Sequence, residues 1–187
     1  MRIGLSRLEK NLQFISLAAL SEGNLLDLLE IRNQPFVRQN MYTDHVICVD
    51  EHLAWAHNVR NSTSMEFFGV FRRGELIGGA GLSNISKLHR RADWAFFVSE
   101  KLKGLGLGAS LEYSFISMIF ANFEIDKLNC EVISYNEKVV KLHKRFGFEV
   151  EGVRREHVIR HGQKHDVVLL GITRNEWEVK WHQSIDA

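Results

Sequence analysis

Apolar residues recur along the chain with two different spacings, and the change in spacing separates helices from strands. Between residues 25 and 31 they fall three or four apart, which predicts a first helix that Pro35 ends. A second helix is predicted to start after Asp50, a favourable N-cap residue, with its apolar positions between residues 53 and 59. Two helices therefore precede the main strands, with room for a short strand before them.

Shorter apolar runs, separated by turn-forming residues, follow these helices. Glycine-containing connections at residues 72–75 and 160–163 are typical of hairpins. The predicted strands are 66–71, 76–82, 92–99, 128–134, 148–159 and 167–173, with helices at 109–121 and 137–146. This order predicts an α/β (α+β) fold with a mixed central sheet flanked by helices.

Composition narrows the class of protein. The chain has 187 residues, of which 45% are hydrophobic and 25% charged, so we expect one globular domain over residues 1–187. There are 24 Lys and Arg against 23 Asp and Glu, a net charge of +1. The chain therefore lacks the basic surplus of a dedicated nucleic-acid binder, and we expect no nucleic-acid partner.

Targeting and redox signals point to the cytoplasm. Charges interrupt residues 1–10, unlike the apolar stretch of a secretory signal. No run approaches the roughly 20 apolar residues that cross a bilayer, so no membrane association is expected. Cys48 and Cys130 lie in apolar surroundings without C-x-x-C spacing, which predicts free, buried thiols in a reducing compartment.

The most informative segment runs from Val98 to Leu111 and passes from a strand through three glycines directly into a helix. Glycine permits positive φ and allows a ligand to approach the backbone closely. Successive amides at a helix N-terminus form a concave nest that favours an anion, for which a diphosphate is a natural occupant. The alternative is a tight turn that needs only small residues. P-loop and Rossmann patterns fit poorly, because no Lys-Ser or Lys-Thr follows and the loop comes after three strands.

The sequence Lys103-Gly104-Leu105-Gly106-Leu107-Gly108 resembles the acetyl-CoA signature of the GNAT superfamily of N-acetyltransferases, Arg/Gln-x-x-Gly-x-Gly/Ala. Lys103 stands where Arg or Gln is usual and keeps the positive charge. A second family feature is a strand that leads to Asn136, followed by a helix closed by Phe146-Gly147-Phe148. The resemblance covers about residues 12–173. It implies a mostly antiparallel sheet whose fourth and fifth strands splay apart.

The resemblance also implies acetyl-CoA as the co-substrate. The backbone amides of Lys103, Gly104, Leu105, Gly106, Leu107, Gly108 and Ala109 would hold its diphosphate. The strand carrying Phe97 and Val98 would pair with the pantetheine arm, and Asn136 would bind the arm from the other side. An amide near Val98 would then polarise the thioester carbonyl.

Two residues are candidates for acid–base chemistry. Glu131 lies within an apolar strand, where a charge is costly unless it has a partner or a task, so we expect it to be the general base. The alternative is an outward carboxylate on an edge strand.

His143 occupies a position where many family members carry the tyrosine that protonates the leaving thiolate. At neutral pH an imidazole is only partly protonated, because its ordinary pKa is about 6.5 against about 10 for a phenol. We expect His143 to be the general acid or to hydrogen-bond the sulfur; the alternative is a packed histidine.

The two predicted helices and the loop between them should form the acceptor site. Their polar and aromatic residues are Arg32, Asn33, Met41, Tyr42, His52 and Trp55. His52 and Trp55 are three apart and share a helix face, although buried packing explains Trp55 equally well. This set resembles the N-acetyltransferases of pseudaminic-acid biosynthesis, which implies a catalytic role for His52 in support of Glu131.

These observations predict an acetyl-CoA-dependent N-acetyltransferase. The branch resemblance implies a small-molecule acceptor, the 4-amino group of a UDP-linked 4-amino-4,6-dideoxy-N-acetyl-altrosamine. Direct attack in a ternary complex is expected, since no Cys or Ser nucleophile stands beside a recognisable base. Two alternatives stay open: acetylation of the N-terminal amine of a ribosomal or other protein, and a non-catalytic acyl-CoA-binding module. The tail at residues 176–181 fits either a cover for the sheet or a contact within a homodimer.

A metal site is not expected, although nine histidines raise the question. His157, His161 and His165 recur every four residues, a spacing that aligns side chains only on a helix. Gly162 and the β-rich flanks instead predict a hairpin.

Overall fold

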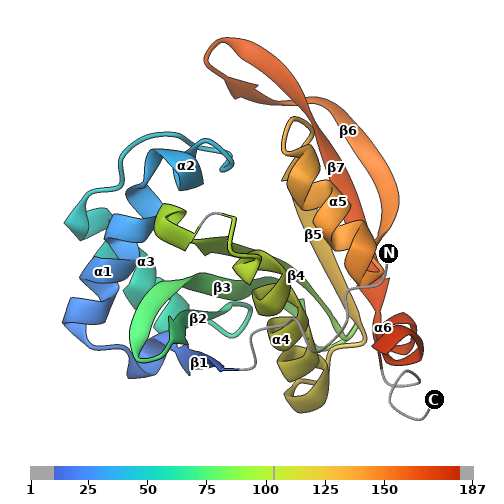
Figure 1. Cartoon of the computed structure of the whole chain (residues 1–187), viewed down its shortest axis with the longest axis horizontal. Helices are drawn as coiled ribbons and strands as arrows, with labels where there is room; N and C mark the ends of the chain where they lie inside the picture. Colours follow the sequence, from blue (N-terminus) through green and yellow to red (C-terminus); the bar gives the residue numbers. More distant parts are fainter. Residues whose placement is uncertain (1–10, 103, 182–187) are drawn as a thin grey trace.

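In the computed structural model, which describes residues 11–102 and 104–181, one mixed sheet has helices on both faces (Figure 1). Its strand order is β1-β2-β3-β4-β5-β7-β6. The strands are β1 Leu12–Ser16, β2 Glu66–Arg72, β3 Glu75–Ser86, β4 Arg91–Val98, β5 Lys127–Ile133, β6 Glu149–Arg160 and β7 Gln163–Thr173. The predicted strands are all present, and β1 is the short strand for which the sequence left room.

The helices are α1 Glu22–Asn33, α2 Pro35–Arg38, α3 Val49–Arg60, α4 Leu107–Asn122, α5 Glu137–Phe146 and α6 Arg174–Trp181, with short 3₁₀ turns η2 Leu17–Ala19 and η3 Glu100–Leu102. Pro35 ends α1 and also starts α2, since its missing N–H is harmless at a first helical position. The predicted start of the second helix was wrong by two residues. Cys48 is the N-cap, and Asp50 lies in the first turn, where a negative charge complements the helix dipole.

Neighbouring strands are antiparallel except at the centre of the sheet, where β4 and β5 run parallel. These two strands pair only over Arg91–Asp93 and Lys127–Asn129, and then diverge (Figure 1). We call the paired part the closed end, and the part comprising residues 94–98 and 130–133 the open end. The expected mixed sheet with splayed fourth and fifth strands is therefore confirmed.

Each face of the sheet has its own apolar core. One core joins the sheet to α4, α5 and α6, and includes Phe115, Ile119, Phe146 and Trp177. The other lies under α1 and α3, where Leu25 and its neighbours pack on the opposite side of β2. Side chains that alternate along β4 and β5 therefore point towards different helices.

The C-terminal helix α6 completes the first of these cores. Trp177 and Trp181 are both buried and contact Tyr113 of α4, while the indole N–H of Trp181 donates to the Phe146 carbonyl at 3.2 Å. Of the two roles considered for the tail, the structure places it as a cover on the α4–α5 layer.

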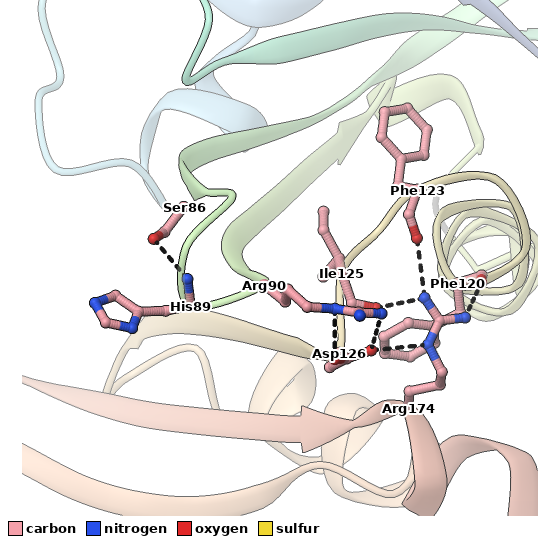
Figure 2. A network of polar contacts seen from close by, with 8 residues as sticks. All are labelled: Ser86, His89, Arg90, Phe120, Phe123, Ile125, Asp126 and Arg174. Atoms are coloured by element: carbon pink, nitrogen blue, oxygen red, sulfur yellow. Dashed lines mark hydrogen bonds and ion pairs between the residues drawn. The ribbon is translucent and has the colours of Figure 1, made fainter.

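The closed end is held by a network around Arg174 (Figure 2). The guanidinium of Arg174 donates to the backbone carbonyls of Phe120, Phe123 and Ile125, and lies 3.3 Å from a carboxylate oxygen of Asp126. The same carboxylate pairs with Arg90 at 2.7 Å. One arginine thereby satisfies carbonyls at the end of α4 and fixes the start of β5 beside the start of β4.

The two cysteines differ. Both are free, as predicted, and Cys130 is also buried as predicted. The predicted burial of Cys48 was wrong, because this residue caps α3 at the end of an exposed loop. Among the described residues, no helix combines the length and apolar character that crossing a membrane requires.

Candidate active site

The open end leaves strand edges without a partner strand. Residues 94–98 of β4 pair with β3, and residues 130–133 of β5 pair with β7, but the two segments do not pair with each other. Phe97 and Val98 lie on the β4 edge. The amides and carbonyls of these edges that face the split require another partner, such as an extended amide-containing ligand.

The glycine-rich turn leads from β4 into α4. Gly104 and Gly106 have φ values of 84° and 72°, in the left-handed region that glycine adopts readily. Gly106 is the N-cap of α4, which starts at Leu107, two residues before the predicted start. The amides of Leu107 and Gly108 have no acceptor within the helix, so they remain available to an anion. Ala109 donates to Gly106 instead, at 3.1 Å, and Lys103 lies outside the described residues.

Asn136 stands on the other arm of the split, after β5. It is the N-cap of α5, and its carbonyl accepts from the amides of Val139 and Val140 at 3.0 and 3.2 Å. Its side chain makes no capping hydrogen bond, although asparagine is well suited to make one. The side-chain amide is thus available beside the open end.

Glu131 projects from β5 on the face opposite α4 and α5, where two side chains hold its carboxylate. Arg154 of β6 donates to Oε1 at 2.5 Å, and the hydroxyl of Tyr42 donates to Oε2. Burial, reinforced by the hydrogen bond to Glu131 and the charge of that residue, raises the pKa of Tyr42 well above its ordinary value. The phenol therefore keeps its proton and remains a donor at neutral pH.

His143 lies on the opposite face and is 3% exposed. Its Nδ1 is 2.9 Å from Oε1 of Glu112, a fully buried carboxylate of α4. The ring packs against Trp94 and Phe96, which are open-end residues of β4, and against Phe148. Glu131 and His143 thus flank the split from its two sides.

The predicted pair of His52 and Trp55 is a stacked pair, with ring centroids 5.1 Å apart. Trp55 continues edge-on to Phe67, which contacts Phe97, so aromatic rings connect α3 to β4. Burial lowers the pKa of His52, as does the charge of Arg32, while a backbone hydrogen bond opposes the shift. Among the described residues, Nε2 of His52 has no hydrogen-bond partner, and no hydrogen bond joins this ring to Glu131.

Arginines from three elements meet beside these rings. Arg160 of β6 is 4% exposed and donates to the carbonyls of Met41 and Arg38, at 2.8 and 3.2 Å. Arg38 in turn donates to the carbonyl of Asn33 at 2.9 Å. Burial lowers the pKa of Arg32, and the charges of Arg38 and Arg160 add to this shift. Nη1 of Arg32 and Nε of Arg160 are buried without a hydrogen-bond partner in the described part of the chain.

The loop between α2 and α3 carries the other predicted acceptor residues and is held by hydrogen bonds to α1, to β6 and to β5. Both side-chain atoms of Asn33 bind the backbone of Ile47, each at 2.9 Å, so this residue holds the loop rather than facing outwards. Met41 contributes its carbonyl to Arg160, and Tyr42 reaches across to β5. Tyr135, directly after β5, donates to the Gln39 carbonyl.

Sequence reasoning missed three polar residues at this site. Arg154 and Arg160 belong to β6, whose register relative to the rest of the sheet depends on bulges that no local pattern reveals. Glu112 did give a signal: it is the one charged residue within α4. Its partner, 31 residues away, emerges only from the packing of α5 on α4.

The histidines of the β6–β7 hairpin do not gather. His161 and Gly162 form its tip with φ values of 49° and 75°, while the rings of His157 and His165 pack against Tyr42 and Tyr135 respectively. Within the described ranges, no group of three His, Cys, Asp or Glu side chains is placed to hold a metal ion.

Comparison with known proteins connects this architecture to a family. The profile described as Acetyltransferase (GNAT) domain matches residues 17–169. "Putative ribosomal N-acetyltransferase YdaF" of Bacillus subtilis is 26% identical over 110 residues, which are 59% of this chain and 60% of that protein. "Acetyltransferase PseH" of Campylobacter jejuni is 26% identical over 133 residues, or 71% of this chain and 82% of that protein. The matched segment thus spans less than two thirds of the first of these relatives.

Solved structures agree on the fold. Spermidine N-acetyltransferase from Vibrio cholerae, crystallised with CoA and spermine, superposes with a TM-score of 0.83 and 21% sequence identity. The superposition covers 90% of this chain and 99% of that structure. At this identity the likeness defines the arrangement of sheet and helices and leaves the acceptor to be argued from the side chains.

Proposed function

Since this chain belongs to the GNAT acetyltransferase family and is an acetyl-CoA-dependent N-acetyltransferase, we propose that its acceptor is a nucleotide-linked amino sugar. The acceptor in this proposal is the 4-amino group of a UDP-linked 4-amino-4,6-dideoxy-N-acetyl-altrosamine. The observation that carries it is the arginine group beside the open end, formed by Arg32, Arg38 and Arg160.

The arginine group favours an anionic acceptor. Arginine keeps its charge even when burial lowers its pKa, and a buried guanidinium atom without a partner is costly unless a ligand completes it. A diphosphate can accept in bidentate fashion from such a donor. Two carboxylates also lie nearby, Asp44 at 3.8 Å from Arg160 and Glu51 close enough to act on Arg32, but the three arginines outnumber them. The net charge therefore argues against spermidine, although the fold resembles that of a spermidine acetyltransferase.

The neighbouring rings suit the rest of such an acceptor. Trp55 is half-buried and stacks on His52, and Tyr42 is 43% exposed at the mouth of the split. A nucleotide base stacks well on an aromatic ring. We assign Arg32, Met41, Tyr42 and Trp55 to acceptor binding, with Asn33 supporting the loop through Ile47.

Acetyl-CoA would bind along the split. The amides of Gly104, Gly106, Leu107 and Gly108 would hold the diphosphate, together with Lys103, whereas those of Leu105 and Ala109 already donate to the carbonyls of Leu102 and Gly106. Phe97, Val98 and Asn136 would contact the pantetheine arm. The thioester would then lie between the diverging strands, with the backbone N–H near Val98 polarising its carbonyl. Because the split opens on both faces of the sheet, a thioester that lies in it would be accessible from both.

The reaction divides between those faces. Glu131, whose carboxylate oxygens accept from Arg154 and Tyr42, takes the proton of the attacking amine through a water. The amine bonds to the carbonyl carbon, the C–S bond breaks, and the sulfur takes its proton from His143. His52 lies on the acceptor side of the split, where its neutral ring stacks on Trp55 and makes no hydrogen bond to Glu131.

The deciding experiment offers purified protein acetyl-CoA with three amines: the UDP-amino sugar, spermidine and a peptide with a free N-terminus. Released CoA thiol is followed. We expect kcat/KM for the sugar to exceed the other two at least 100-fold, with free UDP acting as a competitive inhibitor. Faster turnover of spermidine would reject the anionic acceptor.

A variant pair tests whether the arginines carry this preference. Arg32→Met should raise KM for the sugar about 10- to 100-fold, because it removes a charge-assisted contact, while KM for acetyl-CoA stays the same. Arg73→Met, in the exposed turn between β2 and β3, is the matched control. An equal effect of both variants would show that general charge, and not this site, is responsible.

One relative favours a second candidate function. The Bacillus subtilis protein that matches over 110 residues carries the name of a ribosomal N-acetyltransferase. The peptide in the panel covers this candidate, and insensitivity to UDP together with turnover of the peptide would support it.

A further inference from the structure

Glu112 is a carboxylate in the middle of the larger apolar core. It is 0% exposed, and its helical neighbours Leu111, Phe115 and Ile116 are also fully buried. Burying an ionisable pair usually costs more than its attraction returns, so such a pair is weak evidence of a stabilising role. Its presence here therefore calls for a different explanation.

The partner of Glu112 is His143, with 2.9 Å between Oε1 and Nδ1. The other carboxylate oxygen, Oε2, has no hydrogen-bond partner among the described residues, which leaves His143 as its principal polar contact. Burial raises the pKa of Glu112, and the neighbouring imidazole partly opposes this shift. Both side chains are almost completely buried, so their contact lies in a site that excludes bulk water.

The pair sits beside the split. The ring of His143 lies edge-on to Trp94, with centroids 5.3 Å apart, and 6.2 Å from the ring of Phe96. Trp94 follows directly on the last β4–β5 pair, Asp93 with Asn129, and Phe96 lies two residues further along β4. On the β5 side lies the buried thiol of Cys130, whose pKa is raised first by burial and then by the charge of Glu112.

We propose that Glu112 is a positioning residue for acetyl transfer: it fixes the ring of His143 through Nδ1, so that Nε2 faces the departing sulfur of CoA. This inference rests on the proposed acid role of His143 and not on the identity of the acceptor. When the C–S bond breaks, its electron pair stays on sulfur. The sulfur takes the proton from Nε2, and the neutral ring keeps its Nδ1 contact with Glu112. Solvent reprotonates the ring after CoA leaves.

An imidazole needs such support more than a phenol would. Its ring is shorter, so a small rotation about χ2 would move Nε2 away from the sulfur. A carboxylate bonded to the far nitrogen fixes both the ring plane and the tautomer, and it stabilises the protonated ring. In this chain the carboxylate comes from the neighbouring helix, which explains why a charged side chain is tolerated in that core.

A double-mutant cycle separates this role from a purely structural one. Glu112→Gln should lower kcat about 10- to 100-fold, as outer-shell partners of histidine typically do, with KM for acetyl-CoA within twofold of the wild type. In a His143→Gln background the same change should cost less than a further twofold, because the residue through which it acts is gone. Losses that multiply would overturn the proposal.

Glu156→Gln is the matched control, since Glu156 is an exposed carboxylate paired with Lys164 at 2.6 Å on the β6–β7 hairpin. It should leave kcat within twofold. The cycle uses whichever amine of the panel the wild type acetylates fastest, so a wrong acceptor assignment does not affect its outcome.

A measurement on the wild type covers the case in which a variant does not fold or no amine reacts. The protein labelled with ¹⁵N-histidine is titrated with CoA and with desulfo-CoA, and the ring nitrogens of His143 are followed by NMR. We expect the Nε2 resonance to differ between the two complexes and the Nδ1 resonance to stay the same. Identical Nε2 resonances would show that this nitrogen does not meet the sulfur, and the proposal would be rejected.

Discussion

The closed and open ends of the β4–β5 pair differ in how their polar groups are matched. At the closed end, the guanidinium of Arg174 meets backbone carbonyls and the carboxylate of Asp126, so donors and acceptors are matched within the chain (Figure 2). Around the open end lie the ionisable side chains that have a buried atom without a partner among the described residues: Arg32, His52, Glu112 and Arg160. One end is complete in itself and the other is completed by ligands.

This difference explains how one sheet combines rigidity with access. Parallel strands that diverge lose ladder hydrogen bonds, which must be recovered elsewhere. The network at the closed end fixes the angle between β4 and β5, and the α2–α3 loop contacts the far end of β5 through Tyr42 and Tyr135. Just before α2, Gln34 donates to the Ser99 hydroxyl after β4 at 3.3 Å. The split can therefore stay open without closing into a regular sheet or falling apart.

The largest expected effect comes from breaking the open end at Glu131. Glu131→Gln should lower kcat about 10³-fold, equivalent to about 4 kcal/mol in the barrier, because the amide cannot accept the proton of the amine. Steady-state release of CoA thiol measures the loss. The unfolding midpoint should change little, since an amide can still bond to Tyr42.

Glu151 provides the matched comparison at the closed end. Like Glu131 it is a strand carboxylate paired at 2.5 Å with a cation on the strand beyond β7, in this case Lys127 of β5. Glu151→Gln should leave kcat within twofold of the wild type. If both variants lost activity equally, Glu131 would have no special place in the reaction.

The next largest effect comes from breaking the closed end. Arg174→Ala removes several charge-assisted hydrogen bonds and exposes carbonyls at the end of α4, so we expect a loss of about 3 kcal/mol in the free energy of unfolding. For a domain of this size the melting temperature should fall by about 6–12 °C. Calorimetry measures the shift, and kcat below the transition should be retained within about threefold. A large loss of kcat with an unchanged melting temperature would contradict the division between the two ends.

How far the sequence predicts this molecule differs between the fold and the site. Elements with a strong local pattern were predicted well: α5 has the predicted bounds, Glu137–Phe146, because a charged face alternates with an apolar one and Gly147 ends the helix. The start of α3 was misplaced because Asp50 suits both an N-cap and a first turn. The short helix α2 has no apolar period to reveal it.

At the site, the residues that local motifs mark were found and their partners were not. The glycines before α4 and the histidine of α5 follow from spacing along the chain. Arg154, Arg160 and Glu112 act through contacts with residues 23 to 122 positions away. Such contacts depend on strand register and helix packing, which single-sequence patterns do not determine.

A smaller effect is expected in the glycine-rich turn that borders the open end. Gly106→Ala should cost about 1 kcal/mol of stability, since its φ of 72° is unfavourable for any residue with a Cβ. Because the change also disturbs the first amides of α4, KM for acetyl-CoA should rise about three- to tenfold. Gly74→Ala is the control: it has a φ of 82° and equally open surroundings in the β2–β3 turn. It should show the same loss of stability with no change in KM. If KM for acetyl-CoA rose equally in both variants, the turn before α4 would not be the binding site of the diphosphate.

The smallest effect separates the two ends by pH. The closed end is held by arginines and an aspartate, whereas the acceptor side of the open end contains a buried histidine, His52, whose pKa is lowered mainly by burial. Above about pH 6.5 the ring is neutral in both the native and the unfolded chain, so it contributes no pH dependence. Below that pH the unfolded chain takes up a proton that the native chain resists. Stability should therefore fall as the pH drops from about 6.5 towards the native pKa, and level off below it.

Urea unfolding midpoints of the wild type and His52→Gln between pH 5 and 8 test this dependence. The wild type should lose more stability than the variant on the acid side, and the two curves should run parallel above about pH 6.5. His89→Gln, an exposed histidine at the closed end, is the control and should follow the wild-type curve. If His52→Gln also followed it, the ring would be as accessible to protons in the native chain as in the unfolded one. The acceptor side around His52 and Trp55 would then be open to water in the absence of ligand, and His52 could take part in proton transfer rather than in packing.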